Sequence, residues 1–215
     1  MFWGDVHLGH PKCLWKKALL NLDYALIHKV YVLLMGDLID SQSQTDKTYQ
    51  MINALEPLAK EKLLIGLHTG NHEIQITKNT GIDISKKIAH LLDIPYFPYG
   101  CLSSLQVGKF CYNLYSLHGF DDMRFKSTRL KLASYLNCWI DIDIIALGHA
   151  HSLSVKTFQS SNAVQRHIYQ IVLTGSYLAH NLNQIGRAIF WPHAYPFPKI
   201  GSPKLRLYAT KKCSL

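Results

Sequence analysis

Short motifs that combine glycine with acidic, amide or imidazole side chains recur along this chain of 215 residues. Each motif lies close to an apolar run, so its polar side chains would stand at the end of a strand. Carboxylate, amide and imidazole groups can bind divalent metals, and carboxylates and imidazoles can also transfer protons. In chain order the five motifs are Gly4-Asp5-Val6-His7, Gly36-Asp37-Leu38-Ile39-Asp40, Gly70-Asn71-His72-Glu73, His118-Gly119 and Gly148-His149-Ala150-His151.

Hydrolysis of a phosphoester at neutral pH is a reaction that such side chains could support. Two divalent ions about 3.5–4 Å apart lower the pKa of bound water, clamp the phosphate and stabilise the leaving oxygen. Ions that close need a shared carboxylate, and Asp37 is the expected bridge because it follows the most buried-looking strand. One His or Asp beside glycine is more often a turn or a helix cap. The ordered set, rather than any single motif, therefore indicates a dinuclear site.

Strands must bring these motifs together. Nearly continuous apolar runs at residues 30–35, 62–67 and 142–147 predict strands that are buried on both faces. Asp37, Asn71 and His149 would then follow the carboxyl ends of strands, which is where open α/β sheets form their sites. Glycine beside each motif would let the backbone turn tightly there.

Helices and further strands fill the sequence between the motifs. Apolar residues at helical spacing predict helices over 14–26, 48–60, 84–92 and 125–136, and Pro57 is expected to end or kink the second one early. Gly108-Lys109 predicts a hairpin, and the other strands are expected at 102–107, 110–117, 154–159, 167–173 and, at an edge, 205–209. This alternation predicts a layered α/β fold. We expect a single domain over 1–215, with the motif core in 1–175 and a basic segment rich in proline and aromatic residues in 176–215.

Composition limits the class of protein. The chain is 48% hydrophobic and long enough for one sizeable core, and it has no run of eighteen apolar residues for a membrane helix. Asp5 lies so near the first residue that no signal peptide is expected. The five cysteines are odd in number and lack CxxC spacing, so neither a disulfide framework nor a cysteine zinc site is expected. A cytoplasmic location fits these features best.

Positive charge is concentrated in the last third of the chain. The net charge is +9, yet up to Asp143 the basic residues exceed the acidic ones by only one. No acidic residue follows Asp143, whereas eight Lys and Arg residues do. Such asymmetry favours a polyanionic partner, and DNA or RNA is the partner we expect, although a basic surface can also be merely solvated.

The series D-x-H, GDxxD, GNH(D/E), H-G and GHxH resembles that of the calcineurin-like metallophosphoesterases. The resemblance runs from Asp5 to His151 and implies a four-layer α-β-β-α sandwich of two mixed sheets flanked by helices. It also implies two divalent metal ions, manganese first, with iron, zinc, nickel or magnesium as alternatives. The resemblance assigns Asp5, His7, Asp37 and His151 to one ion, and Asp37, Asn71, His118 and His149 to the other.

The same resemblance implies roles for further residues. His72 corresponds to the family's non-ligand histidine, which contacts the phosphate and protonates the leaving group. Glu73 is expected to hold the ring of His72, and Asp40 to orient Asp5 or His7 or to cap the following helix. Near the substrate pocket, the expected contacts are Tyr177, His180 and His10.

Departures from the family's branches narrow the substrate. Protein serine/threonine phosphatases have an arginine after their second motif and another before GNHE, whereas here Ser41 follows Asp40 and Thr69 precedes Gly70. The opening Asp5-Val-His-Leu-Gly9 resembles the D-x-H-L-G of double-strand-break repair nucleases and related phage phosphodiesterases. We therefore expect a phosphodiesterase or nuclease that works by attack of metal-bound hydroxide. The alternatives are a small-molecule phosphodiesterase or pyrophosphatase, acting on cyclic nucleotides, nucleotide sugars or a lipid precursor, and a catalytically silent scaffold.

Overall fold

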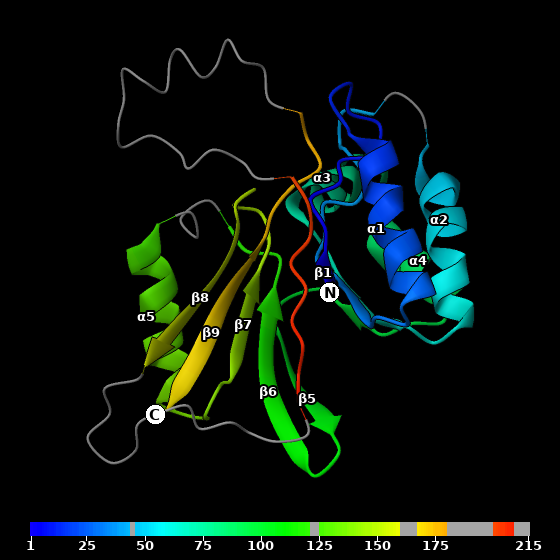
Figure 1. Ribbon diagram of the computed structural model, residues 1–215. Helices are drawn as coiled ribbons and strands as arrows, with labels where there is room; N and C mark the ends of the chain where they lie inside the picture. Colours follow the sequence, from blue (N-terminus) through cyan, green and yellow to red (C-terminus); the bar gives the residue numbers. More distant parts are fainter. Residues whose placement is uncertain (44–45, 121–124, 160–166, 180–199, 209–215) are drawn as a thin grey trace.

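Two β-sheets packed face to face, with helices on both outer sides, form the fold (Figure 1). The computed structural model describes residues 1–43, 46–120, 125–159, 167–179 and 200–208. Its helices are α1 (Trp15–Ile27), α2 (Thr48–Lys60), α3 (Asn71–Thr80), α4 (Ile84–Leu91) and α5 (Lys126–Asn137). Helices α1, α2 and α4 cover the first sheet, and α5 covers the second. This is the layered α/β fold that the sequence predicts.

The first sheet is parallel throughout and the second is mixed. The first has the order β1-β2-β3-β4, with β1 (Phe2–Trp3), β2 (Val32–Leu34), β3 (Leu64–His68) and β4 (Tyr96–Phe97). The second has the order β5-β6-β7-β9-β8, with β5 (Cys101–Val107), β6 (Phe110–Leu117), β7 (Ile144–Leu147), β8 (Leu153–Gln159) and β9 (Ile168–Thr174). Strands β5 and β6 form the hairpin expected around Gly108-Lys109.

Strand β2 shows why its sequence is apolar without a break. Val32 and Leu34 face helices α1, α2 and α4, whereas Leu33 and Met35 face the second sheet. Because side chains of a strand alternate between its faces, a strand covered on both sides needs apolar residues at every position. Strand β7 alternates in the same way between α5 and the first sheet.

Pro57 does not end α2 early, which was one of the two outcomes expected from the sequence. The helix continues to Lys60, and the backbone N–H of Glu61 still donates to the carbonyl of Pro57. Leu55 and Leu58, on either side of the proline, are buried in the core. Their packing offsets the hydrogen bond that proline cannot make.

The edge strand expected at 205–209 is not formed by residues 205–208, and residue 209 lies outside the described residues. Leu205 and Leu207 pack against the apolar cluster between the two sheets. Just before them, the carbonyl of Pro203 accepts a hydrogen bond from the N–H of Phe2. The alternating pattern therefore reflects side-chain packing against the core without strand pairing.

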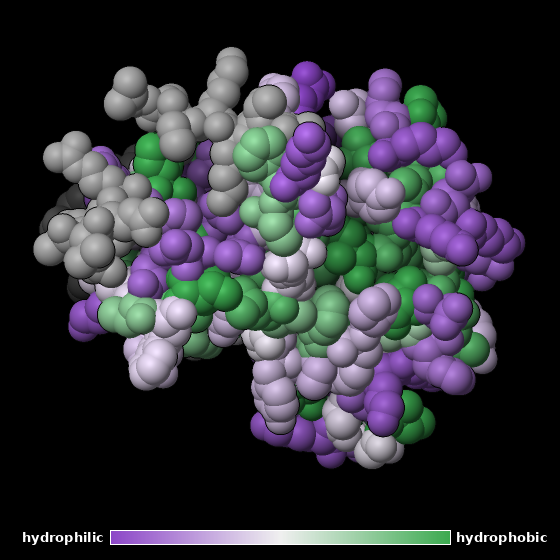
Figure 2. All heavy atoms as spheres, turned by 90° about the horizontal axis from the view of Figure 1, so that it is seen from below, coloured by the Kyte–Doolittle hydropathy of each residue, from purple (hydrophilic) through white to green (hydrophobic). Residues whose placement is uncertain are grey.

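Within the described part of the chain, no helix has both the length and the apolar character to span a membrane. The face seen from below in Figure 2 has apolar residues towards its middle and polar residues along its right-hand edge. The four cysteines that lie in the described residues are free thiols: Cys13, Cys101, Cys111 and Cys138.

A buried histidine links the two sheets. Nδ1 of His68, at the end of β3, donates to the carbonyl of Tyr99 at 2.9 Å, and the Ser116 hydroxyl on β6 donates to Nε2 at 2.8 Å. This pattern requires a neutral ring. Burial is the main reason that the pKa of His68 falls to about 4.

We expect His68 to make the protein less stable in weak acid. The unfolded chain binds a proton at this residue near pH 6.5, whereas the folded chain does so only near pH 4. Stability is therefore lost as pH falls from 6.5 to 4, by about 3 kcal/mol, since each unit is worth about 1.4 kcal/mol. In urea unfolding with chelator, the difference in stability between the wild type and His68→Gln should change by this amount over the same pH range, to the disadvantage of the wild type in acid. Parallel profiles for wild type and His68→Gln would contradict the assignment.

Candidate metal centre

The loops that follow β1 and β2 run side by side and carry three of the predicted ligands. The N–H of Asp5 donates to the carbonyl of Gly36 at 2.9 Å, and the N–H groups of Val6 and His7 donate to the carbonyl of Asp37 at 2.8 and 2.9 Å. These bonds extend the parallel pairing beyond the strands. They bring Asp5, His7 and Asp37 to one edge of the first sheet, where all three side chains are buried.

The loops of the second sheet hold Asp5 from the other side. The N–H of His149, after β7, donates to Oδ1 of Asp5 at 3.0 Å. At the end of β9 the Thr174 hydroxyl donates to Oδ2 at 3.0 Å, and just beyond the strand the Ser176 hydroxyl donates to the Asp5 carbonyl at 3.1 Å. Neither hydroxyl is among the predicted site residues, although the nearby Tyr177 is predicted to contact the substrate. The site is thus built from the strand ends of both sheets.

Five of the predicted ligands have a left-handed backbone conformation. Asp5, His7, Asp37, His149 and His151 have φ angles between 48° and 59°. Residues with a Cβ atom rarely adopt this conformation, and at functional sites it persists because the surrounding structure enforces it. Here the enforcing contacts are the hydrogen bonds between the neighbouring loops.

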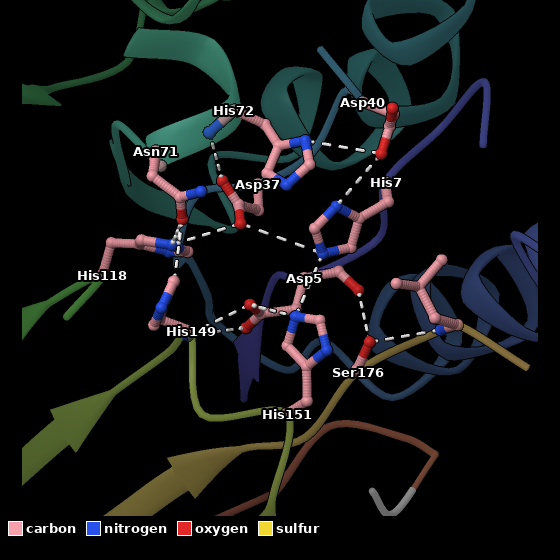
Figure 3. Close-up of polar contacts among 12 residues, drawn as sticks. Asp5, His7, Asp37, Asp40, Asn71, His72, His118, His149, His151 and Ser176 are labelled. Atoms are coloured by element: carbon pink, nitrogen blue, oxygen red, sulfur yellow. Dashed lines mark hydrogen bonds and ion pairs between the residues drawn. The ribbon is translucent and has the colours of Figure 1, made fainter. Parts of the chain in front are cut away.

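The polar side chains form two clusters that share Asp37 (Figure 3). In the first, Nε2 of His151 lies 3.4 Å from Oδ1 of Asp5 and 3.1 Å from Nε2 of His7. Asp37 joins this cluster through Oδ2, which lies 3.8 Å from Nε2 of His7.

In the second cluster, Oδ2 of Asp37 lies 3.3 Å from Nε2 of His118. Oδ1 of Asn71 lies 3.0 Å from that same nitrogen and 2.8 Å from Nδ1 of His149. The two groupings are the ones that the resemblance implies.

The arrangement of these atoms fits divalent cations. Nε2 of His7 and Nε2 of His151 face each other at 3.1 Å, whereas Nδ1 of His7, on the other side of its ring, is directed at Asp40. Nδ1 of His118 donates to the carbonyl of Met35 at 2.8 Å, which leaves the lone pair of Nε2 directed at Asp37 and Asn71. Nitrogen and oxygen donors in this mixture suit first-row transition metals.

The electrostatics of the site also favour a positive charge. Burial lowers the pKa of His118, but the neighbouring Asp37 carboxylate outweighs it and raises the pKa to about 10. In the same way, burial opposes ionisation of Asp37, but His118 and His7 hold its pKa below the usual range. The pocket therefore holds a proton strongly, and a metal cation can take that proton's place.

His72 lies beside both clusters and is partly exposed. Its ring makes an edge contact with that of His7, with 4.5 Å between the ring centroids. Nδ1 accepts a hydrogen bond from the N–H of Ser41 at 3.1 Å and lies 3.4 Å from Oδ2 of Asp40. In the neutral ring, this leaves the proton on Nε2. Burial lowers the pKa of His72.

Asp40 and Ser41, rather than Glu73, contact the ring of His72. Oδ2 of Asp40 also lies 3.6 Å from Nδ1 of His7, and its Oδ1 accepts a hydrogen bond from the N–H of Gln42 at 2.8 Å. Glu73 is completely buried and accepts hydrogen bonds from the backbone N–H groups of Asp37, Ile39 and Gly70, at 2.9 to 3.0 Å. Its carboxylate therefore fixes the Asp37 loop against the start of α3. The prediction that Glu73 holds the ring of His72 is wrong.

The structure does not place the side chains of Tyr177 and His10 as the predicted substrate contacts require. Tyr177 is fully buried, lies against Trp3 and bonds to the Ser202 hydroxyl, so its side chain does not face a substrate. His10 is half-buried, and its Nδ1 accepts from the N–H of Lys12 at 3.0 Å in a local turn. His180 lies outside the described residues.

Comparison with known proteins identifies related sequences and folds. Residues 1–177 match the family described as calcineurin-like phosphoesterase, and none of the curated proteins searched matches the chain. Similar solved structures include Vps29 from Cryptosporidium parvum (16% identity, TM-score 0.43, covering 81% of this chain and 72% of that one). Another is a hypothetical protein from Thermus thermophilus (17%, 0.46, 94% and 88%). A third is Vps29 from Entamoeba histolytica in complex with Zn²⁺ (17%, 0.41, 81% and 72%). These values are too low to bear on function.

Proposed function

Because the chain belongs to the calcineurin-like phosphoesterase family, we propose that it is a two-metal phosphodiesterase that cleaves nucleic acids or nucleotides. The observation that supports this most is the convergence of two ligand clusters on one carboxylate, Asp37. Asp5, His7, Asp37 and His151 would hold one ion, and Asp37, Asn71, His118 and His149 the other. Manganese is our first choice. Bound there, a pair of divalent ions would activate water and stabilise charge on the phosphate.

His72 serves as the general acid in this proposal. The acid form is the imidazolium, in which Nδ1 would donate to Oδ2 of Asp40, 3.4 Å away, and Nε2 would present its proton to the leaving oxygen. The N–H of His72 donates to Oδ1 of Asp37 at 2.9 Å, which ties the position of the acid to the proposed bridging ligand. This hydrogen bond would hold His72 at a fixed position relative to the bound phosphate. Correct positioning supplies a large part of what a general acid contributes to the reaction rate.

The preference for diesters over monoesters is supported by the residues that replace the phosphatase arginines. The N–H and hydroxyl of Ser41 are directed at His72, and the hydroxyl of Thr69 donates to the Tyr96 hydroxyl at 2.9 Å. Neither position offers a guanidinium to pair with the second negative charge of a monoester. A diester, with one charge, needs no such partner.

Replacing His72 by alanine tests the assignment of the acid. For a diester with an alkyl or nucleoside leaving group, kcat should fall by about a hundredfold or more. A p-nitrophenyl diester should lose much less, because p-nitrophenolate leaves without a proton. The two rates are measured with Mn²⁺, with His90→Ala as control and metal content as a second readout. Equal losses on both substrates would show that His72 acts in some other way.

A substrate panel separates the remaining alternatives. We would compare bis-p-nitrophenyl phosphate, p-nitrophenyl phosphate, cyclic nucleotides and single- or double-stranded DNA. Rapid hydrolysis of the monoester alone would overturn the diesterase proposal. Cleavage of small diesters but not of DNA would favour a small-molecule phosphodiesterase, and metal binding without any hydrolysis would favour a silent scaffold.

We further infer a single domain, since residues 203–207 pack against both sheets.

A further inference from the structure

Thr174 is a buried threonine at the end of β9 whose hydroxyl is directed at the proposed metal centre. The residue is 1% exposed, and its hydroxyl donates to Oδ2 of Asp5 at 3.0 Å. Strand β9 pairs with β7 on one side and with β8 on the other, where Thr174 is the partner of Leu153. A side chain on a strand that is paired on both sides is a rigid support for the group that it contacts.

The hydrogen bonds to Asp5 distinguish its two carboxylate oxygens. Oδ2 accepts from the Thr174 hydroxyl and, at 3.3 Å, from the N–H of His149. Oδ1 accepts from that same N–H at 3.0 Å and lies 3.4 Å from Nε2 of His151, its neighbour in the first cluster. Thr174 therefore holds one oxygen, and the other is left beside the imidazoles of the first cluster (Figure 3).

The second cluster has supports of its own. Nδ1 of His118 donates to the carbonyl of Met35 at 2.8 Å, and the N–H of His72 donates to Oδ1 of Asp37 at 2.9 Å. Within the described part of the chain, Thr174 makes no hydrogen bond to a ligand of the second ion alone. Removing its hydroxyl therefore loosens a ligand of the first ion and leaves the supports of the second in place.

We propose that Thr174 is a positioning residue for the first metal ion, whose hydroxyl fixes the Asp5 carboxylate so that Oδ1 faces the ion. The proposal rests on the two-metal centre of the proposed function and adds to it a residue that is not itself a ligand. Removing the hydrogen-bond partner of a metal ligand typically lowers metal affinity by about 10–100-fold. We expect a loss of that size for the first ion and not for the second.

Thr174→Val tests the proposal, because valine keeps the shape of threonine and removes the hydroxyl. In a titration with Mn²⁺, the wild type should bind two ions per chain, and in Thr174→Val one of them should bind about 10–100-fold more weakly. At limiting Mn²⁺, the electron paramagnetic resonance spectrum should change from the broad signal of a coupled pair to the resolved hyperfine lines of a lone ion. Thr174→Ser, which restores the hydroxyl, should recover the affinity and the coupled signal.

Thr48→Val is the matched control for a purely structural effect. Thr48 on α2 is also 1% exposed, and its hydroxyl also bonds to an aspartate, Asp46, which is not a proposed ligand. Urea unfolding with chelator measures how much stability each valine variant loses, and only Thr174→Val should lose affinity for Mn²⁺ as well. Loss of Mn²⁺ affinity in both variants would show a structural effect and overturn the proposal.

The remaining outcomes separate the positioning role from the proposed function. Tight binding of both ions by Thr174→Val, or equal weakening of the two, would overturn the positioning role and leave the enzyme assignment intact. If the wild type binds two ions and hydrolyses no phosphodiester, the proposed function fails, while the selective loss of one ion in Thr174→Val still supports the positioning role. A wild type that binds no Mn²⁺ would reject both.

Discussion

Replacing Asp37 by asparagine is expected to lower kcat/KM for a phosphodiester by about a thousandfold or more. The carboxylate is shared by both ligand clusters, so its loss weakens both proposed metal positions at once. A bound ion is worth several kcal/mol of transition-state stabilisation, and each 1.4 kcal/mol is a factor of ten in rate. Asparagine tolerates the left-handed backbone at this position and keeps an oxygen for the N–H of His72.

Metal content distinguishes a lost ligand from a damaged fold. After incubation with Mn²⁺ and gel filtration, the wild type should retain two ions per chain and Asp37→Asn should retain fewer. Added Mn²⁺ should raise the melting temperature of the wild type and have little effect on the variant. Asp23→Asn, which removes an exposed carboxylate from α1, should behave like the wild type in every measurement. Full metal content in Asp37→Asn would remove this residue from the bridging position.

Replacing Gly70 by alanine is expected to destabilise the protein by about 3 kcal/mol or more and to abolish activity. A Cβ atom at this position would lie 2.1 Å from both the backbone nitrogen and Oδ1 of Asp37, and 2.6 Å from Oε2 of Glu73. None of these atoms can move without breaking hydrogen bonds that hold the Asp37 loop. Overpacking of a rigid site costs about 1–3 kcal/mol, and the broken bonds to a buried carboxylate add to that.

Gly81 at the other end of α3 provides the matched control. Its φ of 73° is left-handed, but a Cβ atom there would have nothing within 4 Å. Gly81→Ala should therefore cost only the backbone strain, about 1–2 kcal/mol, and leave activity intact. Gly70 has an ordinary φ of −93°, so any cost of Gly70→Ala comes from crowding alone. Similar stability losses for the two variants, measured by urea unfolding, would contradict this account.

The strands and the ligand clusters could be predicted from the sequence for different reasons. Strands β2 and β7 are buried on both faces, so their apolar runs are unbroken and stand out. The residues of the clusters could be predicted because each motif follows directly after a strand, and parallel strands bring their carboxyl ends to one edge. Where a predicted strand is formed, its ends differ from the expectation by at most two residues.

Helix α3 could not be predicted from apolar periodicity. Its sequence from Asn71 to Thr80 is mostly polar, and Glu73 is its one buried residue. That carboxylate makes long-range bonds to Asp37 and Ile39, which leave no trace in the spacing of residues. Sequence neighbours such as His72 and Glu73 suggest a contact, but adjacent side chains of a helix diverge. The actual partner of His72, Ser41, comes from another loop.

Tyr177 shows a second limit of prediction from sequence. The family resemblance implies that Tyr177 contacts the substrate, and its backbone N–H does lie near the site, donating to the carbonyl of Asp5 at 2.9 Å. The side chain instead turns into the core, because Trp3 and Ser202 offer it an apolar surface and a hydrogen-bond partner. A sequence motif places a backbone near a site more reliably than it orients a side chain.

At five proposed ligand positions, a left-handed backbone and the ability to bind a metal ion favour the same residue types. Apart from glycine, the residues that best tolerate this conformation are Asn, Asp and His, and Asp and His are also metal ligands. The backbone conformation alone therefore tolerates Asp and His at Asp5, His7, Asp37, His149 and His151, whether or not ions are bound. A descendant of this chain that had lost catalysis would drift only slowly away from a metal-binding sequence. Evolutionary loss of function would show first at Asn71 and His118, which the backbone leaves free to change.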